Sequence, residues 1–114
     1  EQLRWTTLEL LQTQRAIERR NAQLRAVRLR RSTPVQAIRR VFGGYWRQAL
    51  AVARCESGLS VAARNGQYRG LFQLGSSERS LYGHGATPIS QASAAHRYFV
   101  ASGRDWSPWQ CKPW

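Results

Sequence analysis

Apolar positions are sparse and widely spaced in the first quarter of the chain. Residues 1–31 contain no Gly or Pro and are rich in Arg, and their regular apolar positions fall seven residues apart, at Leu3, Leu10, Ile17 and Leu24. This spacing predicts one long helix. The second position of a coiled-coil seam would be polar or charged in three repeats, at Thr6, Thr13 and Arg20. We therefore expect a solvated basic helix that links the domain to an anchor or another domain, not a paired coil.

The sequence Ser32-Thr33-Pro34 predicts the end of this helix and the start of another. Pro fits the first turn of a helix, and Ser or Thr caps it. The next apolar positions have helical spacing and stop at Gly43-Gly44: Val35, Ile38, Val41 and Phe42. A compact domain is thus expected over residues 34–114, after a basic helical segment over residues 1–31.

A second helix of the domain is predicted from Trp46 to Glu56, with Gly58 as its C-terminal stop. Residues 63–75 hold Asn-Gly and scattered aromatics, which predict turns and at most a short hairpin. Ser76 is placed to cap a short helix, residues 83–88 form a loop, and residues 89–102 form a final helix, before an irregular aromatic tail. The predicted fold class is all-α, or α+β at most by the hairpin.

The charge of the chain limits its partners without choosing one. At 114 residues with a formal net charge of +12, it is expected to attract nucleic acid, anionic lipid or a phosphate-bearing wall polymer. No apolar run approaches the roughly 20 residues that span a bilayer. The first residue is not Met, so we expect a processed product or a piece of a longer protein, with any signal or anchor outside this sequence.

Glu56 is the only carboxylate between Glu18 and Glu78. It falls in the last predicted turn of its helix, where the helix dipole disfavours a negative charge by roughly 0.3–1 kcal/mol. Apolar neighbours would raise its pKa further by desolvation, and a carboxyl group that stays protonated near neutral pH can act as a general acid. The alternative is an exposed helix-end residue in a weak ion pair with Arg54 or Arg64.

Three ordered motifs resemble those of a known family. The sequence CESGL begins at Cys55, GLFQL spans Gly70 to Leu74, and AAHRYF spans residues 94–99. Together they resemble the soluble-lytic-transglycosylase type of lysozyme-like domain. The Cys before the Glu and the closing WSPWQC are similar to actinobacterial variants and to the resuscitation-promoting factors. The resemblance covers about residues 41–114 and implies a small lysozyme-like fold that cleaves peptidoglycan.

The resemblance also implies a role for individual residues. Glu56 would be the catalytic acid, Ser57 would belong to the floor of the site, and Tyr98 would hydrogen-bond near Glu56 and orient it. Three further residues would line the sugar cleft: Gly70, Leu71 and Gln73. Each has a structural alternative, as a turn, core or helix-packing residue, although an amide between two leucines is hard to explain as core.

Most glycosidases use two carboxylates. Glu78, in the first turn of a helix, and Asp105, in the Trp-rich tail, are both expected to be ordinary surface charges. A single acid fits substrate-assisted chemistry, in which an acetamido group stabilises the oxocarbenium ion, and the resemblance names peptidoglycan as the N-acetylated glycan. A 1,6-anhydro product is expected, with a hydrolysed reducing end as the alternative. No cofactor is predicted.

Cys55 and Cys111 are the only cysteines. In an exported wall enzyme, a bridge between them would pin the tail beside the catalytic helix and stabilise the fold by ~4 kcal/mol in the chain-entropy model. A nucleophilic Cys55 with His84 or His96 as its base is the alternative. A zinc site is discounted, because no short Cys or His pair is present.

The remaining aromatic and loop residues receive plainer assignments. Trp46 is expected in the core and Trp5 on the N-terminal helix, while Trp106, Trp109 and Trp114 are either packing residues or flat faces for sugar rings. His84 is expected to be a structural loop residue.

Two classes of function stay open at this point. One is an extracytoplasmic enzyme, tethered to wall or membrane or carried by a phage virion, that cleaves the bond between N-acetylmuramic acid and N-acetylglucosamine. The other is a non-catalytic wall-binding or assembly module that docks through its basic helix on anionic polymer or membrane. Binding of nucleic acid through the Arg-rich helix is not favoured.

Overall fold

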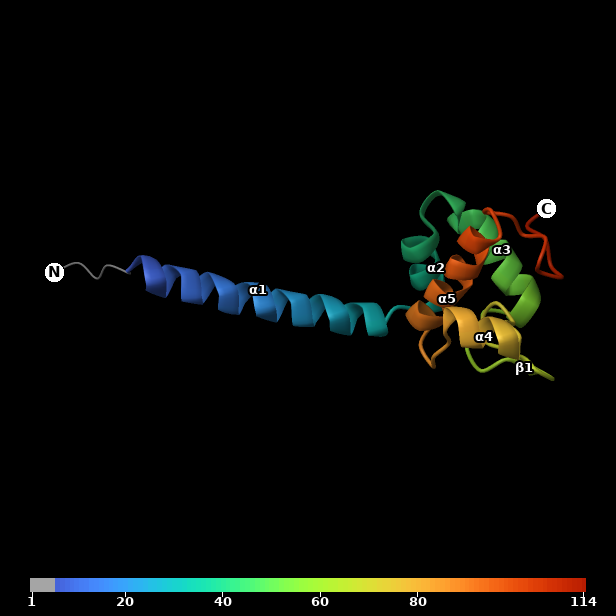
Figure 1. Cartoon of the computed structure of the whole chain (residues 1–114), viewed down its shortest axis with the longest axis horizontal. Helices are drawn as coiled ribbons and strands as arrows, with labels where there is room; N and C mark the ends of the chain where they lie inside the picture. Colours follow the sequence, from blue (N-terminus) through green and yellow to red (C-terminus); the bar gives the residue numbers. More distant parts are fainter. Residues whose placement is uncertain (1–5) are drawn as a thin grey trace.

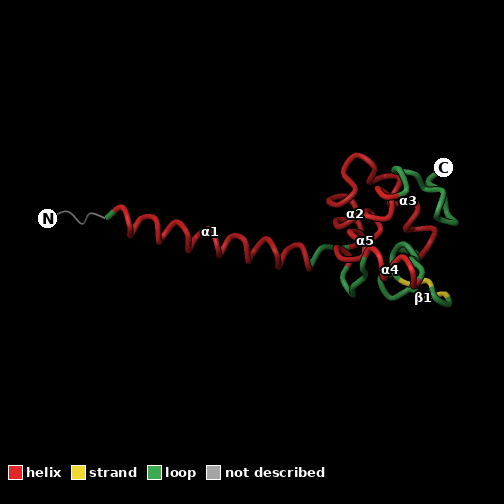
Figure 2. The backbone as a smooth tube through the Cα atoms, viewed as in Figure 1, coloured by secondary structure: helices red, strands yellow, loops and turns green. Residues whose placement is uncertain are grey.

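A computed structural model describes residues 6–114 (Figure 1). The elements follow in the order α1 (Thr7–Arg30), α2 (Pro34–Phe42), the 3₁₀ turn η1 (Gly43–Tyr45), α3 (Trp46–Ser57), β1 (Arg64–Asn65), β2 (Tyr68–Arg69), α4 (Ser76–Tyr82) and α5 (Pro88–Ala101). Within these residues, the two short strands form the only sheet (Figure 2). The predicted class, mostly helical with one short hairpin, is confirmed.

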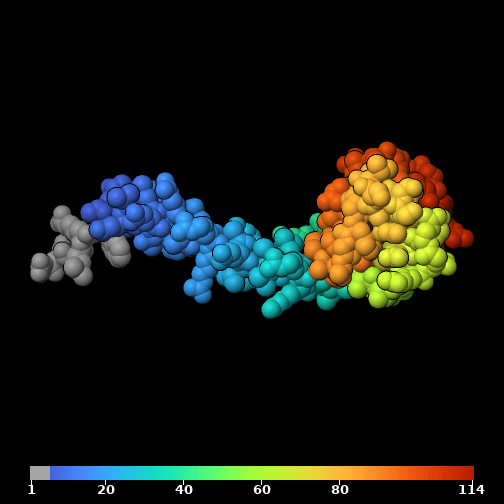
Figure 3. Space-filling model, turned by 60° about the horizontal axis from the view of Figure 1, so that its bottom comes forward, coloured from blue at the N-terminus to red at the C-terminus, as the bar shows by residue number. Residues whose placement is uncertain are grey.

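Helix α1 extends away from the rest of the molecule as a rod (Figures 1 and 3). Thr6 and Glu9 form a capping box at its start, with each backbone N–H donating to the other side chain at 3.1 Å. None of its residues is buried, and the apolar positions of the heptad, Leu10, Ile17 and Leu24, are exposed. The predictions that involve Leu3 and Trp5 lie outside the described residues.

Helix α2 begins where the sequence predicts. Thr33 is the N-cap, Pro34 occupies the first turn, and Gln36 completes a capping box with Thr33. The buried face of α2 carries Ala37, Ile38 and Phe42. This face packs against α3 and α5, so the globular part of the chain begins at α2.

Aromatic rings from four segments form the centre of the core. The rings of Phe99 and Trp106 lie 4.3 Å apart, and Phe42 lies 5.4 Å from Phe72 and 5.7 Å from Trp106. The irregular tail therefore supplies part of the core. The Trp106 indole N–H donates to Gln48 Oε1 at 2.9 Å, which satisfies its one polar atom. Trp46, expected in the core, is instead half-buried at its edge, and the Arg39 and Arg47 guanidiniums lie 4.4 and 4.7 Å from its ring centroid.

The end of α3 places Glu56 in the last helical turn, as predicted. Gly58 adopts the left-handed conformation with φ +63°, and its N–H donates to the Arg54 carbonyl at 2.9 Å. A residue without a Cβ adopts this conformation at no steric cost.

The hairpin that follows has two distinct faces. Arg64 pairs with Arg69 and Asn65 with Tyr68, across a loop that contains Gly66. Because side chains alternate along a strand, each pair shares one face of the hairpin and the two pairs lie on opposite faces.

The last two helices differ slightly from their predicted bounds. Ser76 is the first residue of α4, and Gly75 is its N-cap, so Ser76 does not cap the helix. Helix α5 begins and ends one residue earlier than expected. Thr87 caps it and Pro88 occupies its first turn, since Pro needs no backbone N–H partner there.

Candidate active site

A cleft of about 340 Å³ surrounds Glu56. The end of α3, one face of the hairpin and the turn before α4 line it. The first turn of α4, one residue of α5 and the tail complete the lining. The residues that line it are Cys55, Glu56, Asn65, Tyr68, Gln73, Leu74, Gly75, Glu78, Tyr98, Pro108, Trp109, Gln110 and Cys111. Polar groups and aromatic faces thus meet around half-buried carboxyl groups, in a volume typical of small-molecule sites.

The environment of Glu56 favours its neutral form. Burial raises the pKa of the carboxyl group above its ordinary value of 4.5, while the backbone N–H of Cys111 and the positive charge of Lys112 act in the opposite direction. Desolvation penalises the charged form of a carboxyl group, which is the condition that a general acid needs. The alternative of an exposed Glu56 is wrong, because its side chain is half-buried.

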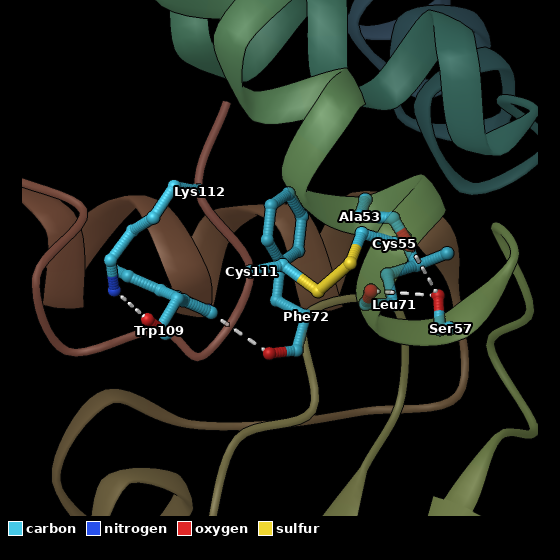
Figure 4. The surroundings of a disulfide bond; sticks show 8 residues. All are labelled: Ala53, Cys55, Ser57, Leu71, Phe72, Trp109, Cys111 and Lys112. Carbon is cyan, nitrogen blue, oxygen red and sulfur yellow. Dashed lines mark hydrogen bonds between the residues drawn. A yellow bond between two sulfur atoms is a disulfide. The ribbon is translucent and has the colours of Figure 1, made fainter. Parts of the chain in front are cut away.

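A disulfide holds the tail against the end of α3 (Figure 4). Cys55 and Cys111 are bonded, with their Cα atoms 6.0 Å apart. The bridge brings the Cys111 N–H and Lys112, the two groups that lower the pKa of Glu56, beside that carboxyl group. Cys55 has no free thiol, so the alternative of a nucleophilic Cys55 is wrong.

Further hydrogen bonds fix the tail around the cleft. The Trp109 indole N–H donates to the Phe72 carbonyl at 3.0 Å (Figure 4). The Lys112 ammonium donates to the Trp106 and Ser107 carbonyls at 3.2 Å and to the Trp109 carbonyl. These contacts turn one face of a mostly buried Trp109 into a wall of the cleft.

Ser57 lies outside the lining of the cleft and supports it. Its hydroxyl is 2.7 Å from the Leu71 carbonyl and 3.0 Å from the Ala53 carbonyl (Figure 4). The residue after Glu56 therefore joins the last turn of α3 to the Gly70–Leu74 segment.

Gly70 and Leu71 also lie outside the lining. Leu71 is fully buried, and its N–H donates to Gln91 Oε1 at 2.9 Å. Gly70 has φ +83°, and a Cβ at this position would lie 2.5 Å from Gln91 Oε1. Both residues hold the segment against α5 and are not placed to contact a ligand in this cleft.

Gln91 is a supporting residue that the sequence analysis missed. It is buried, and its Nε2 donates to the Val61 carbonyl at 3.1 Å and to the Gly85 carbonyl at 2.8 Å. It was detectable by the reasoning applied to Gln73, since an amide on the apolar face of a helix needs partners.

Gln73 lines the Glu56 cleft. Its backbone has φ +50°, and its Nε2 donates to the Gly70 carbonyl at 3.0 Å and the Ala63 carbonyl at 3.2 Å. Both Nε2 protons are thus used within the protein, which leaves Oε1 as the atom that can accept a hydrogen bond from a ligand.

Tyr98 also lies in the cleft, between two aromatic neighbours. Its ring stacks on Tyr82 at 5.2 Å and lies 5.0 Å from Trp109. Burial, followed by the charge of Glu78, raises the pKa of the Tyr98 phenol, so it remains a hydrogen-bond donor. Within residues 6–114 its hydroxyl makes no hydrogen bond to Glu56, so Tyr98 does not orient Glu56 in the manner expected.

Glu78 is a second carboxylate in the same cleft, where a surface charge was expected. It is half-buried, and a Cβ on Gly75 would lie 2.8 Å from its Oε2, so Gly75 permits the close approach of this carboxylate. No local sequence pattern indicates this position, because the hairpin and α4 meet only in the folded chain. Asp105 is exposed as predicted, and accepts a hydrogen bond from Ser107 N at 2.9 Å.

The two histidines and the tryptophans of the tail lie in different surroundings. His96 packs edge-on against Phe42 at 5.1 Å, and burial together with Arg104 and Arg97 lowers its pKa. His84 lines a different pocket. Trp106 is a core residue and Trp114 is 84% exposed, so only Trp109 of the tail's aromatic rings faces the Glu56 cleft.

The disulfide also indicates where the chain folds. Such bridges form and persist in oxidising compartments, so the chain belongs to an extracytoplasmic environment. Within residues 6–114 no helix has the length and apolar character needed to cross a membrane. Comparison of the chain with protein-family models, with curated proteins and with solved structures finds no match.

Proposed function

We propose that the chain is a peptidoglycan-cleaving lytic transglycosylase with Glu56 as its single catalytic acid. The observation that carries the proposal is the position of Glu56: half-buried, with a raised pKa, in a cleft that also offers amide, phenol and indole groups. Such surroundings suit a sugar, which needs hydrogen bonds along its edges and apolar contact on its faces. The choice of peptidoglycan rests on the resemblance of the three motifs.

In the proposed reaction Glu56 donates its proton to the oxygen that links N-acetylmuramic acid to N-acetylglucosamine. The bond from this oxygen to the muramic anomeric carbon breaks, and the acetamido oxygen of the same sugar stabilises the developing cation. The Glu56 carboxylate then takes the proton of the muramic 6-hydroxyl, whose oxygen closes on the anomeric carbon. Glu56 ends protonated, and a 1,6-anhydro sugar forms without consumption of water.

Glu78 bears on the outcome of this reaction. A second carboxylate in the cleft is able, in principle, to hold a water molecule, as in an inverting glycosidase. The charge of Glu78 helps to raise the pKa of the neighbouring Tyr98, so it keeps that phenol protonated beside Glu56. We therefore assign Glu78 to the shape and polarity of the cleft and retain the anhydro product.

The test is release of dye from labelled, purified peptidoglycan. The wild type is expected to release dye, and Glu56→Gln is expected to be slower by about a hundred- to ten-thousand-fold, the loss typical of a missing general acid. Glu18→Gln, on exposed α1, is the matched control. Near-normal release by Glu56→Gln would show that another group performs the chemistry.

A docking role for α1 is a second proposal, and it is compatible with the first. The helix has no buried residue and carries two glutamates against six exposed arginines: Arg15, Arg19, Arg20, Arg25, Arg28 and Arg30. We assign it to contact with an anionic wall polymer or membrane surface outside the cell. Replacing Arg15, Arg19, Arg20 and Arg25 by Gln should abolish salt-sensitive retention on anionic polymer or vesicles and leave turnover of soluble glycan unchanged.

A further inference from the structure

A second pocket, of about 360 Å³, lies on the other side of the hairpin from Glu56. Asn65 and Tyr68 line the Glu56 cleft, whereas Arg64 and Arg69 line the second pocket. This division follows from the register, because each of these pairs is directly opposed across the two strands and successive residues point to opposite faces. One thin hairpin therefore separates the two pockets.

The second pocket is cationic. Arg64, Arg69 and His84 line it, and none of the residues that line it is acidic. Burial and the charges of Arg79 and Arg69 lower the pKa of His84, so the two guanidiniums supply the positive charge and His84 supplies a neutral imidazole. Like charges directly opposite each other destabilise a strand pair, and a bound anion would offset this cost.

The walls of the pocket are small and held in place. Besides the cationic groups, it is lined by short apolar side chains, among them Ala62, Ala63 and Ala86. Buried Gln91 joins its two rims, since the same Nε2 donates to the Val61 and Gly85 carbonyls. The backbone at both rims is thus held before a ligand binds, whereas the Arg64 and Arg69 side chains are exposed.

We propose that this cationic pocket binds a carboxylate of the short peptide that wall glycan carries on its muramic sugar. Arginine pairs recognise planar carboxylates through charge-assisted hydrogen bonds, and the alanine-sized walls fit short aliphatic side chains beside the carboxylate. The inference rests on the proposed function, because the glycan would lie in the Glu56 cleft and its peptide would pass the hairpin into the second pocket.

The test measures binding of a synthetic stem tetrapeptide, L-Ala-γ-D-Glu-L-Lys-D-Ala, by calorimetry on the whole chain. The wild type and the control Arg40→Gln, an exposed position on α2, should bind it alike. The double variant Arg64→Gln/Arg69→Gln should bind at least about tenfold more weakly, with a melting temperature no lower than that of the wild type, because the change removes the like-charge pair across the strands. The same peptide with its carboxylates amidated should bind the wild type no better than the free peptide binds the double variant.

Two outcomes would overturn the inference. Equal binding of the free and amidated peptides by the wild type would show that the arginines do not read a carboxylate. Displacement of the peptide by an equal or lower concentration of inorganic phosphate would show that the pocket takes a phosphate-bearing ligand instead.

Turnover separates this inference from the proposed function. The double variant should lose the preference of the wild type for peptide-bearing glycan over glycan stripped of its peptides, while it cleaves the stripped glycan at the wild-type rate. Cleavage of both glycans with no peptide binding would reject the second site and keep the role of Glu56. Peptide binding that depends on Arg64 and Arg69, with no cleavage of either glycan, would support the second site and reject the catalytic role.

Discussion

Glu56 occupies the last turn of α3, where the helix carbonyls and burial both disfavour a negative charge. The groups that favour its charged form, the Cys111 N–H and Lys112, belong to the C-terminal tail and not to α3. The protonation state of this one side chain thus depends on how closely the tail is held to the helix.

The raised pKa of Glu56 has a consequence for stability. The folded chain binds this proton more tightly than the unfolded chain, so the stabilising contribution is present below the unfolded pKa and is lost as pH rises through the folded pKa. Glu56→Gln should therefore match the wild type in acid and become the more stable of the two near neutral pH. Urea unfolding at about pH 4 and about pH 8 measures this, with Glu18→Gln as the control for removing a carboxylate. A wild type that gains on Glu56→Gln as pH rises would contradict the desolvated acid.

The rate of cleavage should also depend on the ionisation of Glu56 and should fall, as stability does, when pH rises through its pKa. Because the acid works in its protonated form, turnover is expected to be highest below the pKa of Glu56 and to fall as pH rises through it.

Glu78 provides a second test at the level of single residues. If it only shapes the cleft, Glu78→Gln should keep the anhydro product and lose less than about tenfold in rate, far less than Glu56→Gln. Mass spectrometry of the released glycan ends, together with initial rates, measures both. A loss as deep as that of Glu56→Gln would make Glu78 the second catalytic carboxylate.

At the level of elements, the conformation of the segment from Gly70 to Gly75 depends on side chains of other segments that lie close to its glycines, which no local sequence pattern predicts. At Gly70, a Cβ would meet the buried Gln91 amide, and the backbone also has positive φ. Gly66, in the hairpin loop, has a similar φ of +61° but has nothing within 4 Å of its position for a Cβ.

These two glycines form a matched pair of variants. Both Gly→Ala changes introduce the strain of positive φ, but only Gly70→Ala adds the clash, for which overpacking costs of about 1–3 kcal/mol are typical. Gly70→Ala should therefore lower the free energy of unfolding by that much more than Gly66→Ala. Equal losses would show that Gln91 does not hold this segment.

Local signals in the sequence were enough to predict most helix ends. The ring of Pro34 restricts φ to a helical value, and Gly58 adopts the left-handed conformation at no steric cost, so α2 begins and α3 ends beside them. The membership of the cleft depends instead on contacts between distant segments. Of the residues named from the motifs, Gln73 and Tyr98 line the cleft, whereas Ser57, Gly70 and Leu71 lie outside its lining. Glu78, expected to be a surface charge, lines it as well.

At the level of the whole molecule, one covalent bond joins α3 to the tail of the chain. The disulfide between Cys55 and Cys111 spans 56 positions of the sequence, so it encloses the hairpin, α4 and α5. A loop of this length corresponds to a stabilisation of about 4 kcal/mol in the chain-entropy model.

Reduction should therefore weaken the fold and the site together. We expect the free energy of unfolding to fall by about 4 kcal/mol in reductant and turnover to fall with it, because Trp109, Cys111 and Lys112 are released from the cleft. The double variant Cys55→Ser/Cys111→Ser should start at the lower stability and show no response to reductant. A wild type whose unfolding and turnover ignore reductant would contradict this coupling.

The most direct measurement is mass spectrometry of the soluble fragments that the chain releases from purified peptidoglycan. The wild type should release muropeptides whose muramic ends are lighter than hydrolysed ends by one water, about 18 Da, and Glu56→Gln should release at least about a hundredfold less. Ends that all carry the water would replace the transglycosylase with a hydrolase. No release by the wild type, or equal release by Glu56→Gln, would contradict the central proposal that Glu56 cleaves this glycan.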